Sequence, residues 1–135
     1  MSQLKKLDIF IQKRREIAKQ YNNLFSNIEL IKTPKVQNTV EHSYHLYPLQ
    51  IDFEKLPLTK VEFFEKMKKT GMHLQVHYIP IHIQPFYQKN YGFNKGDFSI
   101  SENFYHNEVS LPVYADLSTD DQKKVIKKIE EYINV

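Results

Sequence analysis

The sequence predicts an α+β fold, in which a small, mainly antiparallel sheet is covered by helices and preceded by one long helix. Three observations support this prediction. The chain opens with a long segment of helical periodicity, short strand-like segments alternate with helical ones after it, and turn or capping residues separate them. A length of 135 residues suits one domain with a modest core.

The first predicted element is an amphipathic helix from residue 2 to about residue 27. At 1.5 Å per residue it would extend over roughly 37 Å, which is longer than a small domain needs. A helix of this length usually spans two domains or packs against something outside the chain, because its exposed apolar stripe favours a partner. The residues with helical spacing are Leu4, Leu7, Ile11, Ile17, Ala18, Tyr21, Leu24, Phe25 and Ile28.

Residues 44–53, with the sequence YHLYPLQIDF, alternate as a strand does. Pro48 favours an edge position or a bulge, since proline cannot donate to the ladder of a sheet. The residues expected on one face of the strand are His45, Tyr47, Leu49, Ile51 and Phe53.

A second helix is predicted to begin after Thr59, which forms a capping-box pattern with Glu62, and to stop at Gly71. Its expected apolar stripe is Val61, Phe64 and Met67. Residues 72–78 are predicted to form a second strand, with Met72, Leu74 and Val76 on one side.

The last third of the sequence predicts a short helix over residues 99–107, with Ser101 as its cap, and a third strand in VSLPVY, residues 109–114. Residues 118–121 are expected to cap a final helix. The apolar stripe of this helix is Val125, Ile129 and either Tyr132 or Ile133.

Composition excludes several classes of function. A net charge of +3, with lysines interleaved among acidic residues, argues against a nucleic-acid surface. The absence of cysteine excludes disulfides and thiol catalysis and fits a cytoplasmic protein. No apolar run approaches the roughly 20 residues of a membrane span, so neither a nucleic acid nor a membrane is an expected partner.

The histidines could suggest a metal site, since His77 and His82 are five residues apart and His42 and His45 form H-x-x-H. A zinc site needs three or four converging ligands, and no carboxylate or cysteine has matching spacing, so no metal is predicted. The sequence also lacks G-x-S-x-G and the glycine pattern of a phosphate loop.

Residues 75–93, QVHYIPIHIQPFYQKNYGF, are the candidate site because two histidines, several aromatic rings and two prolines gather in this short stretch. Their rings offer flat apolar faces with polar tips, which suits sugars and nucleotide bases. Pro80 and Pro85 stiffen the backbone. The alternative, that these rings pack in a small core or an interface, remains open.

Four segments together resemble one enzyme family: QLKKLDIFIQKRREIAKQYNNLF, HSYHLYPLQID, GMHLQVHYIPIHIQPFYQKNYGF and VSLPVYADLSTDDQKKVIKKI. They are similar to the C-terminal part of the DegT/DnrJ/EryC1/StrS aminotransferases. Within this family, their sequence most resembles the branch that acts in pseudaminic acid biosynthesis. The family uses pyridoxal phosphate to aminate keto sugars attached to nucleotides. The resemblance covers nearly the whole chain.

The resemblance implies that residues 1–28 form the connecting helix and residues 29–135 the C-terminal small domain of a fold-type I aminotransferase. The large N-terminal domain, which in this family carries the Schiff-base lysine and most phosphate-binding residues, has no counterpart here. We therefore expect no catalytic residue in this chain, no metal, and no activity or bound cofactor for the chain alone. Pyridoxal 5'-phosphate would belong to the complete enzyme.

For the complete enzyme the resemblance implies transfer of an amino group from glutamate to a UDP-linked 4-keto sugar. One wall of the cleft would come from this chain, through His77, Tyr78, His82, Tyr87 and Tyr91. Tyr44 and His45 are expected to be structural. The expected partners are the nucleotide sugar, the missing large domain and a second copy, which forms a homodimer or associates through the first helix. The alternative is a free-standing binding or structural module from a split or truncated reading frame.

Overall fold

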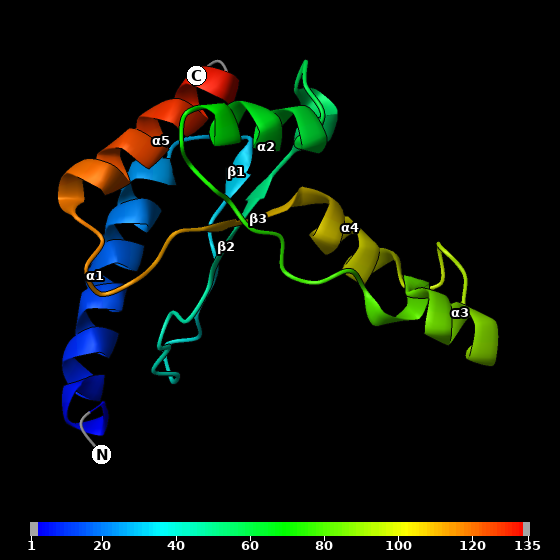
Figure 1. Cartoon of the computed structure of the whole chain (residues 1–135), viewed down its shortest axis with the longest axis horizontal. Coiled ribbons are helices and arrows are strands. Elements are labelled where there is room, and N and C mark those ends of the chain that lie inside the picture. Colours follow the sequence, from blue (N-terminus) through cyan, green and yellow to red (C-terminus); the bar gives the residue numbers. More distant parts are fainter. Residues whose placement is uncertain (1–2, 134–135) are drawn as a thin grey trace.

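Three short antiparallel strands, in the order β1–β2–β3, form the sheet of the computed structural model, which describes residues 3–133 (Figure 1). They are β1 (Ile31–Lys32), β2 (Tyr47–Ile51) and β3 (Glu108–Leu111). Ile31 pairs with Ile51, and Tyr47 pairs with Leu111. With five α-helices on these described residues, the predicted α+β class is confirmed.

The long first helix is present as α1 (Leu7–Phe25), preceded by a 3₁₀ turn over Leu4–Lys6. It ends two residues before the predicted boundary, and residue 2 lies outside the described residues. Only its second half is buried, through Ile17, Ala18, Tyr21 and Phe25. The first half extends beyond the rest of the domain toward the N-terminus (Figure 1), with Leu4, Leu7 and Ile9 exposed.

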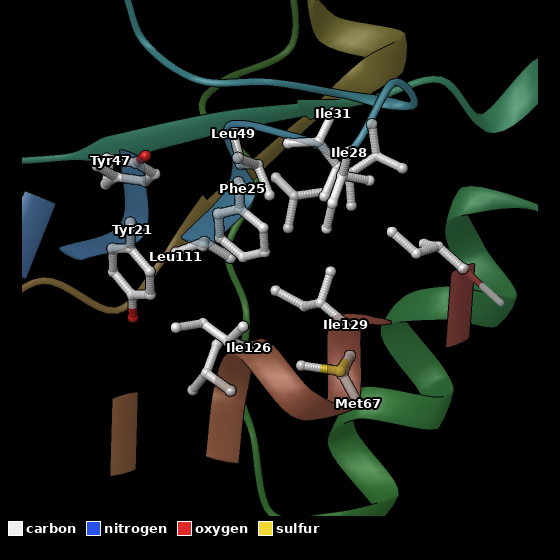
Figure 2. Packing of buried hydrophobic residues seen from close by; sticks show 14 of the residues in the cluster. Tyr21, Phe25, Ile28, Ile31, Tyr47, Leu49, Met67, Leu111, Ile126 and Ile129 are labelled. Atoms are coloured by element: carbon white, nitrogen blue, oxygen red, sulfur yellow. The ribbon is translucent and has the colours of Figure 1, made fainter. Parts of the chain in front are cut away.

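The core lies on one face of the sheet, where α1, α2 (Lys60–Lys69) and α5 (Thr119–Ile133) converge (Figure 2). As predicted, β2 directs Tyr47, Leu49 and Ile51 into it, and all three are fully buried. His45, expected on the same face, lies before the strand and is exposed. The core is therefore built by a strand shorter than the predicted one.

Two tyrosines anchor the core with their hydroxyl groups. The rings of Tyr21 and Tyr47 lie 4.9 Å apart. The Tyr21 hydroxyl donates to the carbonyl oxygen of Pro112 at 3.0 Å, and that of Tyr47 donates to Oδ1 of Asn22 at 2.7 Å. Burial raises the pKa of both tyrosines well above the usual range, so both are neutral donors.

The predicted edge position of β2 is wrong, because β2 is the central strand. Pro48 is tolerated there for a local reason. Its partner Ser110 directs its own N–H and carbonyl to Gln75, away from β2, so the nitrogen of Pro48 faces the opposite side. On that side β1 pairs only with residues 50 and 51 and does not reach Pro48.

The second helix has the predicted capping box. The Glu62 N–H donates to Oγ1 of Thr59 at 3.3 Å, and the Thr59 N–H donates to Oε2 of Glu62 at 2.7 Å. Gly71, at φ 80°, ends the helix in the left-handed region. The predicted stripe was partly wrong, because Phe63 rather than Val61 or Phe64 is buried beside Met67. Adjacent phenylalanines fit the helical period equally well.

The strand predicted over residues 72–78 is wrong, since only Gln75 forms a β-bridge, to Ser110. The next hydrogen-bonded antiparallel pair would join residues 77 and 108. Helix α4 (Ser99–Asn107) runs directly into β3, however, and the Glu108 N–H is still bonded to the carbonyl of Phe104. The ladder therefore stops after one bridge.

The segment from residue 77 to residue 107 extends away from the sheet (Figure 1), and we call it the arm. It contains a 3₁₀ turn over Ile81–Ile83, the unpredicted helix α3 (Pro85–Tyr91), and α4, which has the predicted bounds. Ser101 lies inside α4 and not at its cap. None of the helices within residues 3–133 has the length and apolarity to cross a membrane.

The last helix begins and packs as predicted. Ser118 accepts the N–H of Asp121 with its Oγ at 3.1 Å. The buried stripe includes the expected Val125, Ile129 and Ile133, while Tyr132 is partly buried.

Candidate functional site

Four of the five candidate residues line one hollow on the arm: His77, Tyr78, His82 and Tyr87. The hollow has a volume of about 640 Å³ and is completed by residues from the α3–α4 turn and α4, among them Phe93 and Phe98. Aromatic rings from two segments of the arm, residues 77–87 and 93–98, therefore line it. The rings of residues 77–87 lie close along the chain, and the turn from α3 into α4 adds Phe93 and Phe98 to them.

His77 and Tyr78 form the most accessible side of the hollow. Tyr78 is 82% exposed, and its ring lies 5.1 Å from the exposed ring of His77, inclined by 59°. The backbone beneath them is fixed, since the His77 N–H donates to Oε2 of Glu108 at 2.8 Å. Two free side chains on an anchored backbone suit a wall that contacts a ligand.

His82 occupies a different environment, because its side chain is buried. Its Nε2 lies 2.7 Å from Oε1 of Glu102, and the same oxygen accepts the N–H of Gly96 at 2.7 Å. The hydrogen bond from His82, followed by that from Gly96, lowers the pKa of the Glu102 carboxyl. His82 therefore joins the start of the arm to the α3–α4 turn, and its Nε2 is not available to a ligand.

Tyr87 and Tyr91 lie on successive turns of α3. Their rings stack at 5.9 Å with an interplanar angle of 26°. Tyr91 is 64% exposed and does not line the hollow. Tyr91 was predicted to contact the ligand, but in the structure its ring packs against Tyr87, which lines the hollow.

Tyr44 and His45 stand apart from the hollow, near the start of β2. The Tyr44 ring lies 6.3 Å from that of Tyr47 and 4.5 Å from that of His42. Its N–H donates to Nδ1 of His42 at 3.0 Å. This geometry agrees with the structural role expected for Tyr44.

Glu108 was not singled out by the sequence, although it contacts the candidate site directly. Its side chain is fully buried, and Oε1 accepts the hydroxyl of Ser110 at 2.5 Å while Oε2 accepts the His77 N–H. A glutamate that begins an apolar strand is an unusual residue for a buried position, and only this signal could have indicated it.

A second hollow, of about 620 Å³, lies between α2, residues 72–76 and α4. Its lining is largely apolar but includes Lys60 and His73. The Lys60 ammonium donates to the carbonyl oxygen of Tyr105 at 2.6 Å and lies 5.0 Å from the centre of the Tyr105 ring. Burial lowers the pKa of Lys60, and the charge of Glu108 opposes that shift.

Lys60 and Glu108, beside the second hollow, do not fit pyridoxal phosphate. A Schiff-base lysine needs a free amine and a carboxylate that pairs the pyridine nitrogen. Lys60 has the lowered pKa that such a lysine needs, but its amine is bound to Tyr105. The nearby Glu108 is already bonded to His77 and Ser110. Within residues 3–133, no three histidine, aspartate or glutamate side chains gather as a metal site requires.

Comparison with known proteins gives one family. The model of the DegT/DnrJ/EryC1/StrS aminotransferase family matches residues 1–130. Similar proteins include an uncharacterized protein of Methanocaldococcus jannaschii, 41% identical over 98% of this chain and 34% of its own. The spore coat polysaccharide biosynthesis protein SpsC of Bacillus subtilis is 37% identical, again over 98% and 34%. The UDP-4-amino-4,6-dideoxy-N-acetyl-beta-L-altrosamine transaminase of Campylobacter jejuni is 36% identical, over 93% and 32%.

Two solved structures give the same result for the fold. Helicobacter pylori PseC, an aminotransferase involved in the biosynthesis of pseudoaminic acid, has a TM-score of 0.84 at 29% identity, over 98% of this chain and 35% of its own. The PLP-form of the putative sugar aminotransferase Spr1654 from Streptococcus pneumoniae has a TM-score of 0.87 at 26% identity, over 98% and 33%. The chain thus spans about a third of the length of the relatives it matches. With a match over nearly all its residues, this chain belongs to the DegT/DnrJ/EryC1/StrS aminotransferase family.

Proposed function

We propose that this chain supplies one wall of the sugar-nucleotide cleft of a pyridoxal-phosphate-dependent aminotransferase. The observation that carries the proposal is the hollow on the arm, where the exposed side chains of His77 and Tyr78 stand on an anchored backbone. It lies within a chain of a sugar-aminotransferase family. In this proposal residues 1–28 connect this wall to the part of the enzyme that holds the cofactor.

The chemistry of the hollow supports a sugar nucleotide as its ligand. The faces of Tyr78, Tyr87 and Phe93 can pack against the C–H groups of a sugar or against a base, and the polar tips can bond its hydroxyls. We propose a UDP-linked 4-keto sugar in pseudaminic acid biosynthesis, because a relative from C. jejuni is named as a transaminase for a UDP-linked amino sugar. Glutamate is the proposed amino donor.

The cofactor is proposed to bind outside these 135 residues. The chain spans a third of its relatives, and Lys60 and Glu108 do not fit pyridoxal phosphate because both are already hydrogen-bonded within the domain. When bound, that group acts as the electron sink for transfer of the amino group. The residues of this chain bind and orient the sugar and exclude water from one side of it. Alone, the chain is therefore proposed to be inactive.

Self-association is proposed through the 3₁₀ turn over Leu4–Lys6 and the first half of α1, in a cytoplasmic protein. Leu4, Leu7 and Ile9 are exposed there, and a covered apolar surface is more stable than a hydrated one. The absence of cysteine fits a reducing compartment. Light scattering of the chain tests this: we expect a dimer or larger species that Ile9→Lys dissociates. A monodisperse monomer would contradict the proposal and favour the free-standing module.

A chimera tests the proposed function. The matching last third of H. pylori PseC is replaced by this chain, and amination is followed with glutamate and UDP-linked or dTDP-linked 4-keto sugars. We expect the chimera to bind the cofactor and to convert the UDP-linked sugar. A chimera that binds the cofactor and reacts with glutamate, but rejects both sugars, would contradict the proposed function.

A further inference from the structure

A buried carboxylate holds the backbone of the candidate site in position. Glu108 begins β3, its side chain is fully buried, and it does not line the hollow. A buried carboxylate is costly unless hydrogen bonds and nearby positive charge compensate for lost hydration. The burial of Glu108 inside the domain therefore needs an explanation.

Each oxygen of the carboxylate has one donor. Oε2 accepts the backbone N–H of His77 at 2.8 Å, and Oε1 accepts the hydroxyl of Ser110 at 2.5 Å. Lys60, from α2, supplies the nearby positive charge, and its ammonium donates to the carbonyl oxygen of Tyr105. Hydrogen bonds to a charged acceptor are roughly twice as strong as neutral ones.

The position of this bond in the sheet explains its importance. The last backbone pair between the segment before the hollow and β3 joins Gln75 to Ser110. The Glu108 N–H cannot continue the ladder, since it is bonded to the carbonyl of Phe104. In a continued ladder the carbonyl oxygen of Glu108 would accept the His77 N–H. Here Oε2 of the Glu108 side chain accepts it instead. His77 is thus anchored by a carboxylate immediately before the exposed Tyr78.

We propose that Glu108 is a positioning residue, which fixes the backbone of residues 77–78 and so orients the His77 and Tyr78 side chains along the hollow. Its effect on sugar binding rests on the proposed function, whereas its effect on the backbone does not. A parallel arrangement lies across the hollow, where Glu102 accepts the N–H of Gly96. Glu102 thus provides a matched control.

Amide hydrogen exchange of the 135-residue chain, measured residue by residue by NMR, tests the proposal. In Glu108→Leu, which removes both acceptors, we expect the His77 amide to exchange at least about tenfold faster. Glu108→Gln keeps one acceptor oxygen without the charge, so it should restore much of the protection and leave an increase of about threefold. The amides of Gly96 and of the β2–β3 pair should be unchanged in both variants. In Glu102→Gln the Gly96 amide should exchange faster and the His77 amide should not.

Unchanged exchange of His77 in Glu108→Leu would overturn the proposal, as would an equal increase at His77, Gly96 and the β2–β3 pair. If Glu108→Leu does not fold, Glu108→Gln decides: selective exposure of His77 supports the proposal, and no selective change overturns it. In the chimera, Glu108→Gln should raise KM for the UDP-linked sugar without changing the reaction with glutamate. A chimera that rejects the sugar refutes the proposed function and leaves the exchange result standing.

Discussion

The sheet with its helices and the arm are ordered by different interactions. The sheet, α1, α2 and α5 enclose a continuous apolar core (Figure 2). In the arm, neither α3 nor α4 contains a buried residue, and Tyr78, Phe86 and Ile100 are more than half exposed. Two carboxylates that accept backbone N–H groups, Glu108 and Glu102, hold the arm instead. The apolar core therefore stabilises the first region, whereas the arm presents side chains to its surroundings.

The largest expected loss of stability comes from a substitution in the core, and no substitution in the arm should match it. Phe63 is fully buried and packs edge-to-face on Phe53 at 5.6 Å. Phe63→Ala should lower the free energy of unfolding by about 3–5 kcal/mol, through lost burial and the cavity left behind. Urea denaturation measures the change.

The matched control for that substitution is Phe86→Ala in the arm. Phe86 is 63% exposed, so its loss should change the free energy of unfolding by no more than about 0.5 kcal/mol. Similar losses for both variants would contradict the distinction between the two regions.

A smaller effect is expected at the start of α2. Thr59→Ala removes the side-chain acceptor of the Glu62 N–H and should cost about 1 kcal/mol of unfolding free energy. Thr119→Ala, at the exposed first residue of α5, serves as the control and should change little. A Thr59→Ala protein as stable as the wild type would show that the capping box does not stabilise the domain.

The smallest expected effect is a pH dependence of the stability that Glu102 gives to the arm. The pKa of Glu102 is lowered from its usual 4.5 by hydrogen bonds from His82 and Gly96. The ionised carboxyl therefore stabilises the folded arm, fully above about pH 4.5, and this contribution is lost as pH falls through the lowered pKa. The stability difference between wild type and Glu102→Gln should shrink across that range.

Denaturation curves collected between pH 3 and pH 7 measure this difference, with the values of pH chosen to bracket about 4.5. Glu65→Gln, on the exposed side of α2, is the matched control and should show no such change. A constant difference for Glu102→Gln at every pH would contradict the role assigned to its charge.

Local signals made most of the fold predictable. The helical periods of α1 and α5, the capping box at Thr59 and the alternation of Tyr47, Leu49 and Ile51 depend on neighbouring residues, and the structure bears them out. The errors needed tertiary information. Pro48 lies in a central strand because β1 is short, and residues 72–78 fail as a strand because α4 runs into β3.

The candidate site was only partly predictable, for a similar reason. The rings of residues 77–87 could be grouped from the sequence, because they are close along the chain. The burial of His82 against Glu102 could not, since it depends on the turn between α3 and α4. The contact between Glu108 and His77 joins residues 31 positions apart, beyond the reach of any local pattern.

One pair of variants tests the central claim, that His77 and Tyr78 belong to the wall of a sugar-nucleotide cleft. In the chimera, KM for the UDP-linked sugar is measured for His77→Ala and for His73→Ala, an exposed histidine of the second hollow. We expect His77→Ala to raise KM about tenfold through loss of a polar contact, with the glutamate reaction unchanged, and His73→Ala to have no effect. Equal KM values for wild type and His77→Ala would contradict the claim that His77 contacts the sugar nucleotide.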